Sequence, residues 1–218
     1  MTMRIQSLPI QTTVGLIFAL GSLPCLTLLQ RTPPDSWFGY TIGLFSLTLV
    51  GSCVLALVLW WERLPLTSIG LKPPTIGTVI WGLVMVCIQL YVITPVGTIW
   101  VTALELPSFN AGIDKLQDLP RTYLLALGVI SGCVEELCYR GYATERLGTF
   151  TGKLAFGGCI TLMAFALSHL PFWGLGGVFF TLLGGSLFTL FYLWQRDLLA
   201  NMLAHAAVAS IQLLSISG

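Results

Sequence analysis

Charged side chains are scarce in this chain. Only 9% of its 218 residues are Asp, Glu, Lys or Arg, whereas 56% are hydrophobic, and the mean hydropathy is +0.88. A soluble domain usually carries roughly a quarter charged residues. The polar side chains are therefore too few to cover a water-facing surface, and the composition predicts an integral membrane protein.

An excess of charge of one sign is also missing. The formal net charge is +1, so the chain lacks the basic field that attracts nucleic acid, and we expect no nucleic-acid partner. The six cysteines show no metal-type pairing and lie mostly within apolar runs. This pattern is typical of small side chains that fill helix packing. We expect no cofactor.

Long apolar runs fill most of the chain. A spanning helix needs about 20 mostly apolar residues, and seven stretches qualify. They lie at 13–29, 37–61, 76–104, from 121 onward, 154–170, 174–194, and from beyond 197 to about 215. The loop at 105–120 has room for a short interfacial helix. With no internal repeat, residues 1–218 are predicted to form a single all-α membrane domain, a polytopic bundle whose motif-bearing core covers about 121–215.

The loop charges predict an orientation. Six basic residues fall on the side of the N-terminus and three on the opposite side, and the cytoplasmic side of a membrane protein carries more Lys and Arg. We therefore expect a cytoplasmic N-terminus, in the cell inner (plasma) membrane. The six are Arg4, Arg63, Lys72, Arg146, Lys153 and Arg196, and the three are Arg31, Lys115 and Arg121.

Three charges lie close together in the fourth apolar stretch, in CVEELCYRGY at residues 133–142. A charge at the centre of a span costs about 2.5–3.5 kcal/mol, so each one needs a partner or a purpose. Glu136 and Arg140 are four residues apart on one helix face and can neutralise each other. Glu135 points about 100° away around the helix, which leaves it as the unexplained carboxylate.

The chain has only two histidines, His169 and His205. Either one alone is more often a packed or interfacial residue. Glu135 and His169, however, are equally far from Gly152, in the turn between the fourth and fifth stretches, so an antiparallel hairpin brings them to the same depth. The seventh stretch, with Asn201 one turn before His205, starts from the same side. We expect a catalytic cavity between the fourth, fifth and seventh spans, open to the cytoplasm.

Such a cavity suits amide hydrolysis by an activated water. A desolvated carboxylate is an effective general base, an imidazole can share in holding the water, and imidazole or amide N–H groups can donate to an oxyanion. Neither a nucleophile elbow nor an HExxH sequence supports a serine or zinc-helix enzyme. The residues alone leave open a metal bound by two His and one Glu.

Three segments resemble the motifs of the CPBP family of intramembrane proteases, also called the CAAX-protease and bacteriocin-processing or Abi family. They are EELCYR at 135–140, FALSH at 165–169, and the His of AHAAVA at 204–209. The resemblance implies metal-independent hydrolysis of a peptide or protein substrate, which is a prenylated CAAX tail in some relatives. Bacterial relatives are linked to bacteriocin maturation or self-immunity.

The resemblance also implies a role for each matching residue. Glu135 is expected to be the general base, His169 to help position the water, and His205 to stabilise the oxyanion. Glu136 and Arg140 are expected to organise the site, with Phe165 as a further supporting residue. The family has an Asx residue four positions after the last His, where this chain has Ala209. We therefore consider Asn201, one turn before His205, as a substitute donor.

Two other functions stay open at this stage. Ala209 favours a non-catalytic immunity or accessory protein that keeps the scaffold and binds a peptide or partner. Intramembrane Glu and His are also proton-relay groups, which allows a proton-coupled transporter. The short chain and the lack of repeated halves count against transport.

Overall fold

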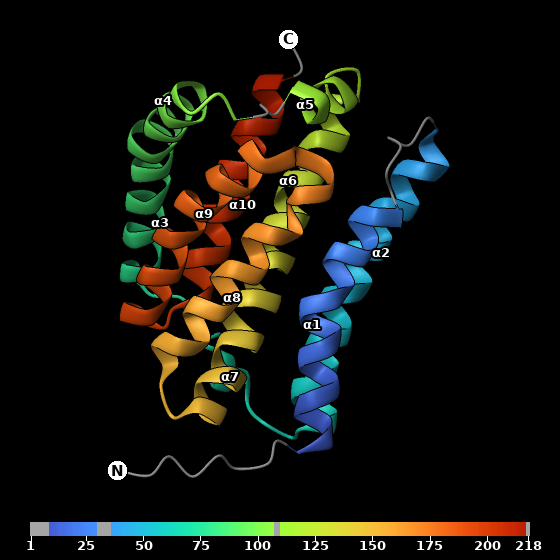
Figure 1. The fold of residues 1–218 in the computed structure, drawn as a ribbon. Helices are drawn as coiled ribbons and strands as arrows, with labels where there is room; N and C mark the ends of the chain where they lie inside the picture. The colour runs from blue at the N-terminus through green and yellow to red at the C-terminus, as the bar shows by residue number, and fades with distance from the viewer. Residues whose placement is uncertain (1–8, 30–35, 107–109, 217–218) are drawn as a thin grey trace.

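The computed structural model describes residues 9–29, 36–106 and 110–216, and all regular elements in this part of the chain are helices. The predicted all-α membrane architecture is confirmed. Figure 1 shows the helices packed roughly parallel and antiparallel to one another, with α1 and α2 side by side at one edge. In chain order the elements are α1 Ile10–Leu29, α2 Trp37–Ala56, η1 Leu57–Trp61, η2 Leu66–Ile69, α3 Ile76–Ile88, η3 Gln89–Ile93, α4 Thr94–Ala103, α5 Asn110–Leu116, α6 Arg121–Glu136, η4 Leu137–Ala143, α7 Thr144–Thr151, α8 Leu154–Ser168, α9 Leu170–Gln195 and α10 Leu198–Ile216.

The long helices follow the apolar stretches closely. Six helical segments among the described residues are long and apolar enough to cross a membrane, and α8 is a shorter apolar helix of 15 residues. Their outward side chains include exposed Phe45, Trp60 and Tyr91, as a lipid-facing surface requires. The described part of α10 ends at the opposite end of the bundle from the start of α1 (Figure 1). The exact number of spans stays a prediction.

Two of the spans that line the cavity described below are interrupted by π-helical turns. The span that begins with α3 contains a π-helical turn at η3, and the span that begins with α6 contains a longer one at η4. A π turn inserts an extra residue and redirects the side chains near it, and such turns often occur at functional sites. The η4 turn starts directly after Glu136, so the motif lies across a change in helix geometry.

Small residues let α6 and α10 approach closely. This is the most extensive helix pair in the bundle. A Cβ atom at Gly132 would lie 2.7 Å from the backbone nitrogen of Ala206, and one at Gly128 would lie 2.7 Å from the backbone of Ser210. Such close approach is typical of small-residue spacing in membrane helices. It brings Glu135 and Glu136 next to the α10 residues Asn201 and His205.

Two ion pairs with buried carboxylates lie at the end of the bundle near the turn at Gly152. Glu62 accepts from Arg146 (2.6 Å), from the Tyr142 hydroxyl (2.8 Å) and from Thr12. Glu145 forms a second pair with Arg196. Because these groups satisfy one another, this end of the bundle is packed with paired polar side chains.

We predict that Gly132→Ala lowers stability by about 1–3 kcal/mol, because the new methyl group collides with the α10 backbone. Thermal unfolding of the purified protein in detergent measures the change. Gly21→Ala is the matched control, since a Cβ there meets no atom within 4 Å and alanine favours the helix. An equal response of the two variants would contradict this account of the α6–α10 contact.

Candidate active site

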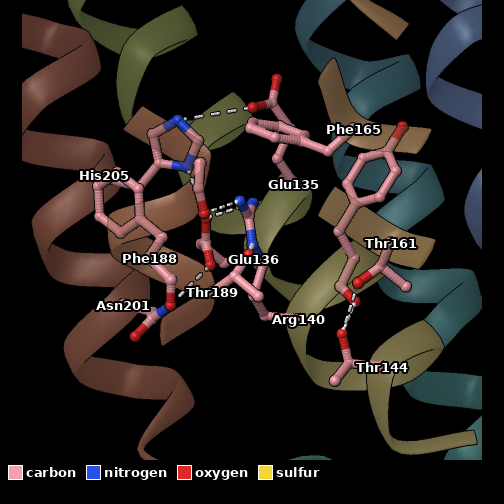
Figure 2. A network of polar contacts seen from close by, with 12 residues as sticks. Glu135, Glu136, Arg140, Thr144, Thr161, Phe165, Phe188, Thr189, Asn201 and His205 are labelled. Atoms are coloured by element: carbon pink, nitrogen blue, oxygen red, sulfur yellow. Dashed lines mark hydrogen bonds and ion pairs between the residues drawn. The ribbon is translucent and has the colours of Figure 1, made fainter. Parts of the chain in front are cut away.

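The carboxylate of Glu136 is the centre of the polar network in Figure 2. Its side chain is fully buried and accepts from Arg140 Nη1 (2.9 Å), His205 Nδ1 (2.8 Å) and Asn201 Nδ2 (3.0 Å). The predicted pairing of Glu136 with Arg140 is confirmed. One carboxylate therefore connects α6 to both Asn201 and His205 of α10.

Arg140 is buried as completely as its partner. It donates to the carbonyl of Gly185 (3.0 Å) and to the Thr189 hydroxyl (3.3 Å), and its guanidinium lies 4.2 Å from the centre of the Phe165 ring. These α9 contacts give the guanidinium partners on several sides, which a charge in the membrane interior needs. Sequence reasoning missed Gly185 and Thr189. The apolar stretch at 174–194 carries no signal in its sequence that singles out these two positions.

His205 lies between the two adjacent carboxylates of the motif. Its Nε2 is 3.6 Å from Glu135 Oε2, while Nδ1 bonds Glu136. An ionised carboxylate only accepts hydrogen bonds, so Nδ1 carries a proton. Phe188 of α9 stacks on the imidazole with ring centres 5.0 Å apart and fixes its plane. Nε2 is thereby aimed at Glu135, whose side chain stays 20% exposed.

His169, at the end of α8, is held by a different contact. Its Nδ1 bonds the carbonyl of Phe165 (2.9 Å) and also lies 3.3 Å from the Ser168 hydroxyl. A carbonyl cannot donate, so the proton is on Nδ1 and Nε2 keeps a lone pair. The Phe165 ring packs edge-on against the imidazole at 4.8 Å. His169 is therefore an acceptor of defined orientation.

A cavity of about 650 Å³ brings the three predicted catalytic residues together. Glu135, His169 and His205 all lie in its wall, and Ala209 lines it one turn beyond His205. Most of the remaining wall is apolar and comes from nearly every helix of the bundle. The cavity is large enough for several residues of a peptide.

The cavity extends toward one end of the bundle. Beyond the site it is lined by Lys115 and Leu116 of α5, Trp173 at the start of α9, and Gln212 and Ile216 near the end of α10. The helix α5 and the C-terminal end of α10 lie at the end of the bundle away from the turn between α7 and α8 (Figure 1). The paired charges around Glu62 and Glu145 lie at the other end, and the predicted opening of the cavity to the cytoplasm stays a prediction.

Asn201 does not line the cavity. It is fully buried, and its amide nitrogen donates both to Glu136 and to the carbonyl of Phe188 (2.9 Å). Both N–H groups are therefore engaged within the network, away from the space where a substrate fits. This placement favours a supporting role over that of a substitute oxyanion donor. At the family's Asx position, Ala209 leaves only a methyl group in the cavity wall.

The site residues do not form a metal-binding cluster. Within the described ranges, no three His, Cys, Asp or Glu side chains are grouped closely enough to share an ion. The contacts of His205 with Glu136 (2.8 Å) and Glu135 (3.6 Å) are those of a hydrogen bond and an ion pair. Metal-free chemistry stays a prediction for experiment.

A known family matches the part of the chain that contains α6 to α10. Residues 118–211 fit the family described as "Rce1-like: Type II CAAX prenyl endopeptidase Rce1-like". This motif-bearing segment, somewhat less than half of the chain, therefore resembles that family. The predicted CAAX-protease resemblance is confirmed, and at family level it supports an intramembrane CAAX-type endopeptidase. The matched residues run from just before α6 almost to the end of α10, so the match includes the cavity's polar centre. No curated protein and no solved structure gave a significant match to the chain.

We predict that Arg140→Met destabilises the protein by about 3–5 kcal/mol, because it leaves Glu136 as a buried charge without its cation. The double variant Glu136→Gln with Arg140→Met should recover part of this loss, since both charges are then gone. Thermal unfolding measures both effects. Lys72→Met, at an exposed position, is the control. A single variant as stable as the wild type would show that the pair does not anchor the network.

Proposed function

We propose that the protein is an intramembrane endopeptidase in which Glu135 activates a water molecule. The observation that supports this most strongly is the position of Glu135. It is the carboxylate of the motif that faces the cavity, whereas Glu136 is fully engaged behind it. The substrate is a peptide or protein segment, lipidated or not, that reaches the site from within or beside the membrane.

The hydrogen-bond pattern suggests how the water is held. Glu135 and the Nε2 lone pair of His169 are both acceptors in the cavity wall. A water that donates one hydrogen to each of them turns its own lone pair toward a carbonyl carbon. Glu135 then takes the proton as the water attacks, and delivers it to the leaving amine when the C–N bond breaks. The proton count balances without a metal.

His205 is proposed to stabilise the negative oxygen that forms during attack. In the protonated state it donates from Nδ1 to Glu136 and from Nε2 into the cavity. Two carboxylates, Arg140 and an imidazolium sum to zero charge, which buried groups favour. A neutral His205 would leave one carboxylate of the motif without a counter-charge. The imidazolium therefore fits both the electrostatics and the proposed role.

The neutral variant Glu135→Gln is predicted to lower the cleavage rate by about 100-fold to 10,000-fold, the usual contribution of a general base. The assay uses the purified protein with a library of internally quenched peptides, both farnesylated and unmodified. Asp118→Asn, at an exposed position outside the cavity, is the matched control and should keep full activity.

The same assay separates this proposal from its competitors. Cleavage that survives a chelator supports the metal-free reaction, whereas loss restored by added metal contradicts it. Equal cleavage by the wild type and Glu135→Gln would remove Glu135 from the mechanism. Absence of cleavage by the wild type would favour the non-catalytic scaffold that Ala209 suggests.

The predicted orientation can be tested at the C-terminus. With a cytoplasmic N-terminus and seven passes, residue 218 and the open end of the cavity face away from the cytoplasm. Alkaline phosphatase fused after Gly218 should then be active in a bacterial host, and a fluorescent protein that matures only in the cytoplasm should stay dark. The opposite pair of results would reverse the orientation and place the cavity opening in the cytoplasm.

A further inference from the structure

Two buried polar atoms in the cavity wall have no hydrogen-bond partner among the described residues. They are the hydroxyl of Tyr139 and the amide oxygen of Gln89. Tyr139 is fully buried and Gln89 is 4% exposed. A buried polar group normally finds a partner, because leaving it without one costs stability. A molecule that occupies the cavity is the natural source of the missing partners.

Gln89 and Tyr139 both lie in π-helical turns with the same hydrogen-bond pattern. Gln89 begins the π turn η3, and its carbonyl accepts from both the backbone N–H and the hydroxyl of Thr94, five residues later (2.8 Å from the hydroxyl). Tyr139 is in η4, and its carbonyl accepts in the same way from Thr144 (hydroxyl distance 2.9 Å). The threonine hydroxyl stabilises the irregular turn in each case. Both orphan groups are therefore fixed in place by their backbone.

Tyr139 lies next to the proposed base. It is one turn after Glu135 on the same helix face, and its ring packs edge-on against Phe165 at 5.1 Å. The Ser168 hydroxyl is a polar neighbour of Tyr139, but it donates to the Phe165 carbonyl (2.7 Å), and no hydrogen bond of ordinary geometry joins it to the tyrosine hydroxyl. A phenol O–H is a good donor to a developing oxyanion. Of the other donors, Asn201 is engaged elsewhere and Ala209 has none.

Gln89 lies on another wall, formed by the span that contains η3. Its side chain packs against Gly184 of α9, where a Cβ atom would come within 2.6 Å of the amide nitrogen. Thr94 and Gln212, which pair with each other (3.2 Å), also line the cavity. An amide oxygen beside such a polar pair can accept from a backbone N–H. A glutamine in the middle of a span has a desolvation cost that this use explains.

We propose that Tyr139 and Gln89 are held unpaired to bind the backbone of a peptide substrate, with Tyr139 donating to the carbonyl oxygen of the bond that is cleaved and Gln89 accepting from a substrate N–H. This inference rests on the proposed endopeptidase function and extends it. Tyr139 becomes the second oxyanion donor, together with His205. Gln89 becomes a binding group for an extended peptide of any side-chain sequence.

The isosteric variant Tyr139→Phe tests the first half of the proposal. In the absence of peptide it should be at least as stable as the wild type, because it removes a hydroxyl without a protein partner. With a quenched peptide that the wild type cleaves, kcat should fall on the order of 100-fold while KM changes little. Tyr142→Phe is the matched control in the same π turn. Its hydroxyl donates to Glu62, so this control should lose stability and keep kcat.

The two measurements on Tyr139→Phe can overturn the inference separately. A thermal midpoint that falls as far as in Tyr142→Phe would show that the hydroxyl has a partner in the protein. A wild-type kcat in Tyr139→Phe, combined with an inactive Glu135→Gln, would reject the oxyanion role and leave the proposed function intact. If Glu135→Gln is as active as the wild type, it is the proposed function that fails.

Gln89→Leu tests the second half. It should raise KM by a few-fold to about tenfold, as expected for one lost hydrogen bond, with kcat and thermal stability maintained. Peptides methylated at one backbone nitrogen at a time identify the matching N–H. At that position, methylation should weaken cleavage by the wild type but add nothing in Gln89→Leu. Full additivity of the two changes at every position would overturn the assignment.

Discussion

The hydrogen bonds of one buried carboxylate, that of Glu136, determine how the helices around the cavity are placed. This side chain has no access to solvent, so every lone pair that is not matched by a donor would cost stability. Arg140, His205 and Asn201 supply the donors. Because two of the three lie on α10, the electrostatics of Glu136 and the close packing at Gly132 act in the same direction. The charge thereby positions the imidazole that faces the cavity.

The aromatic residues around this carboxylate have a complementary role. Phe165 contacts the guanidinium of Arg140 on one side and the edges of His169 and His205 on others, while Phe188 covers the face of His205. Apolar rings exclude water from the ion pairs and so strengthen each of them. They also restrict both imidazoles to one orientation. Without these rings the hydrogen-bond donors would be the same but their directions would be free.

Much of this arrangement was predictable from local spacing. The helical repeat alone separates Glu136, which pairs with Arg140, from Glu135, and the apolar runs predict the helices almost to the residue. What local spacing does not contain is the contact between distant segments. The α9 partners Gly185, Phe188 and Thr189 lie in a helix whose sequence is mostly small and apolar. The direction of the cavity depends on which helix ends are filled, and the pairing of Glu62 with Arg146 joins residues 84 positions apart.

The π turns at η3 and η4 were not predictable from the sequence either. They help to explain how the cavity wall can be stable while two of its polar atoms have no hydrogen-bond partner among the described residues. A regular helix interior satisfies its own backbone, so it offers no reason for a threonine hydroxyl to return to a carbonyl five residues earlier. In both turns that hydroxyl secures the backbone, and the Tyr139 hydroxyl and the Gln89 amide oxygen have no hydrogen-bond partner among the described residues. The ion pairs around Glu136 supply the stability, and the two unpaired groups are the part of the wall whose hydrogen bonds are left for a ligand. A peptide backbone carries both an N–H donor and a carbonyl acceptor, so it can pair with the Gln89 amide oxygen and with the Tyr139 hydroxyl. A lipid tail alone offers neither group.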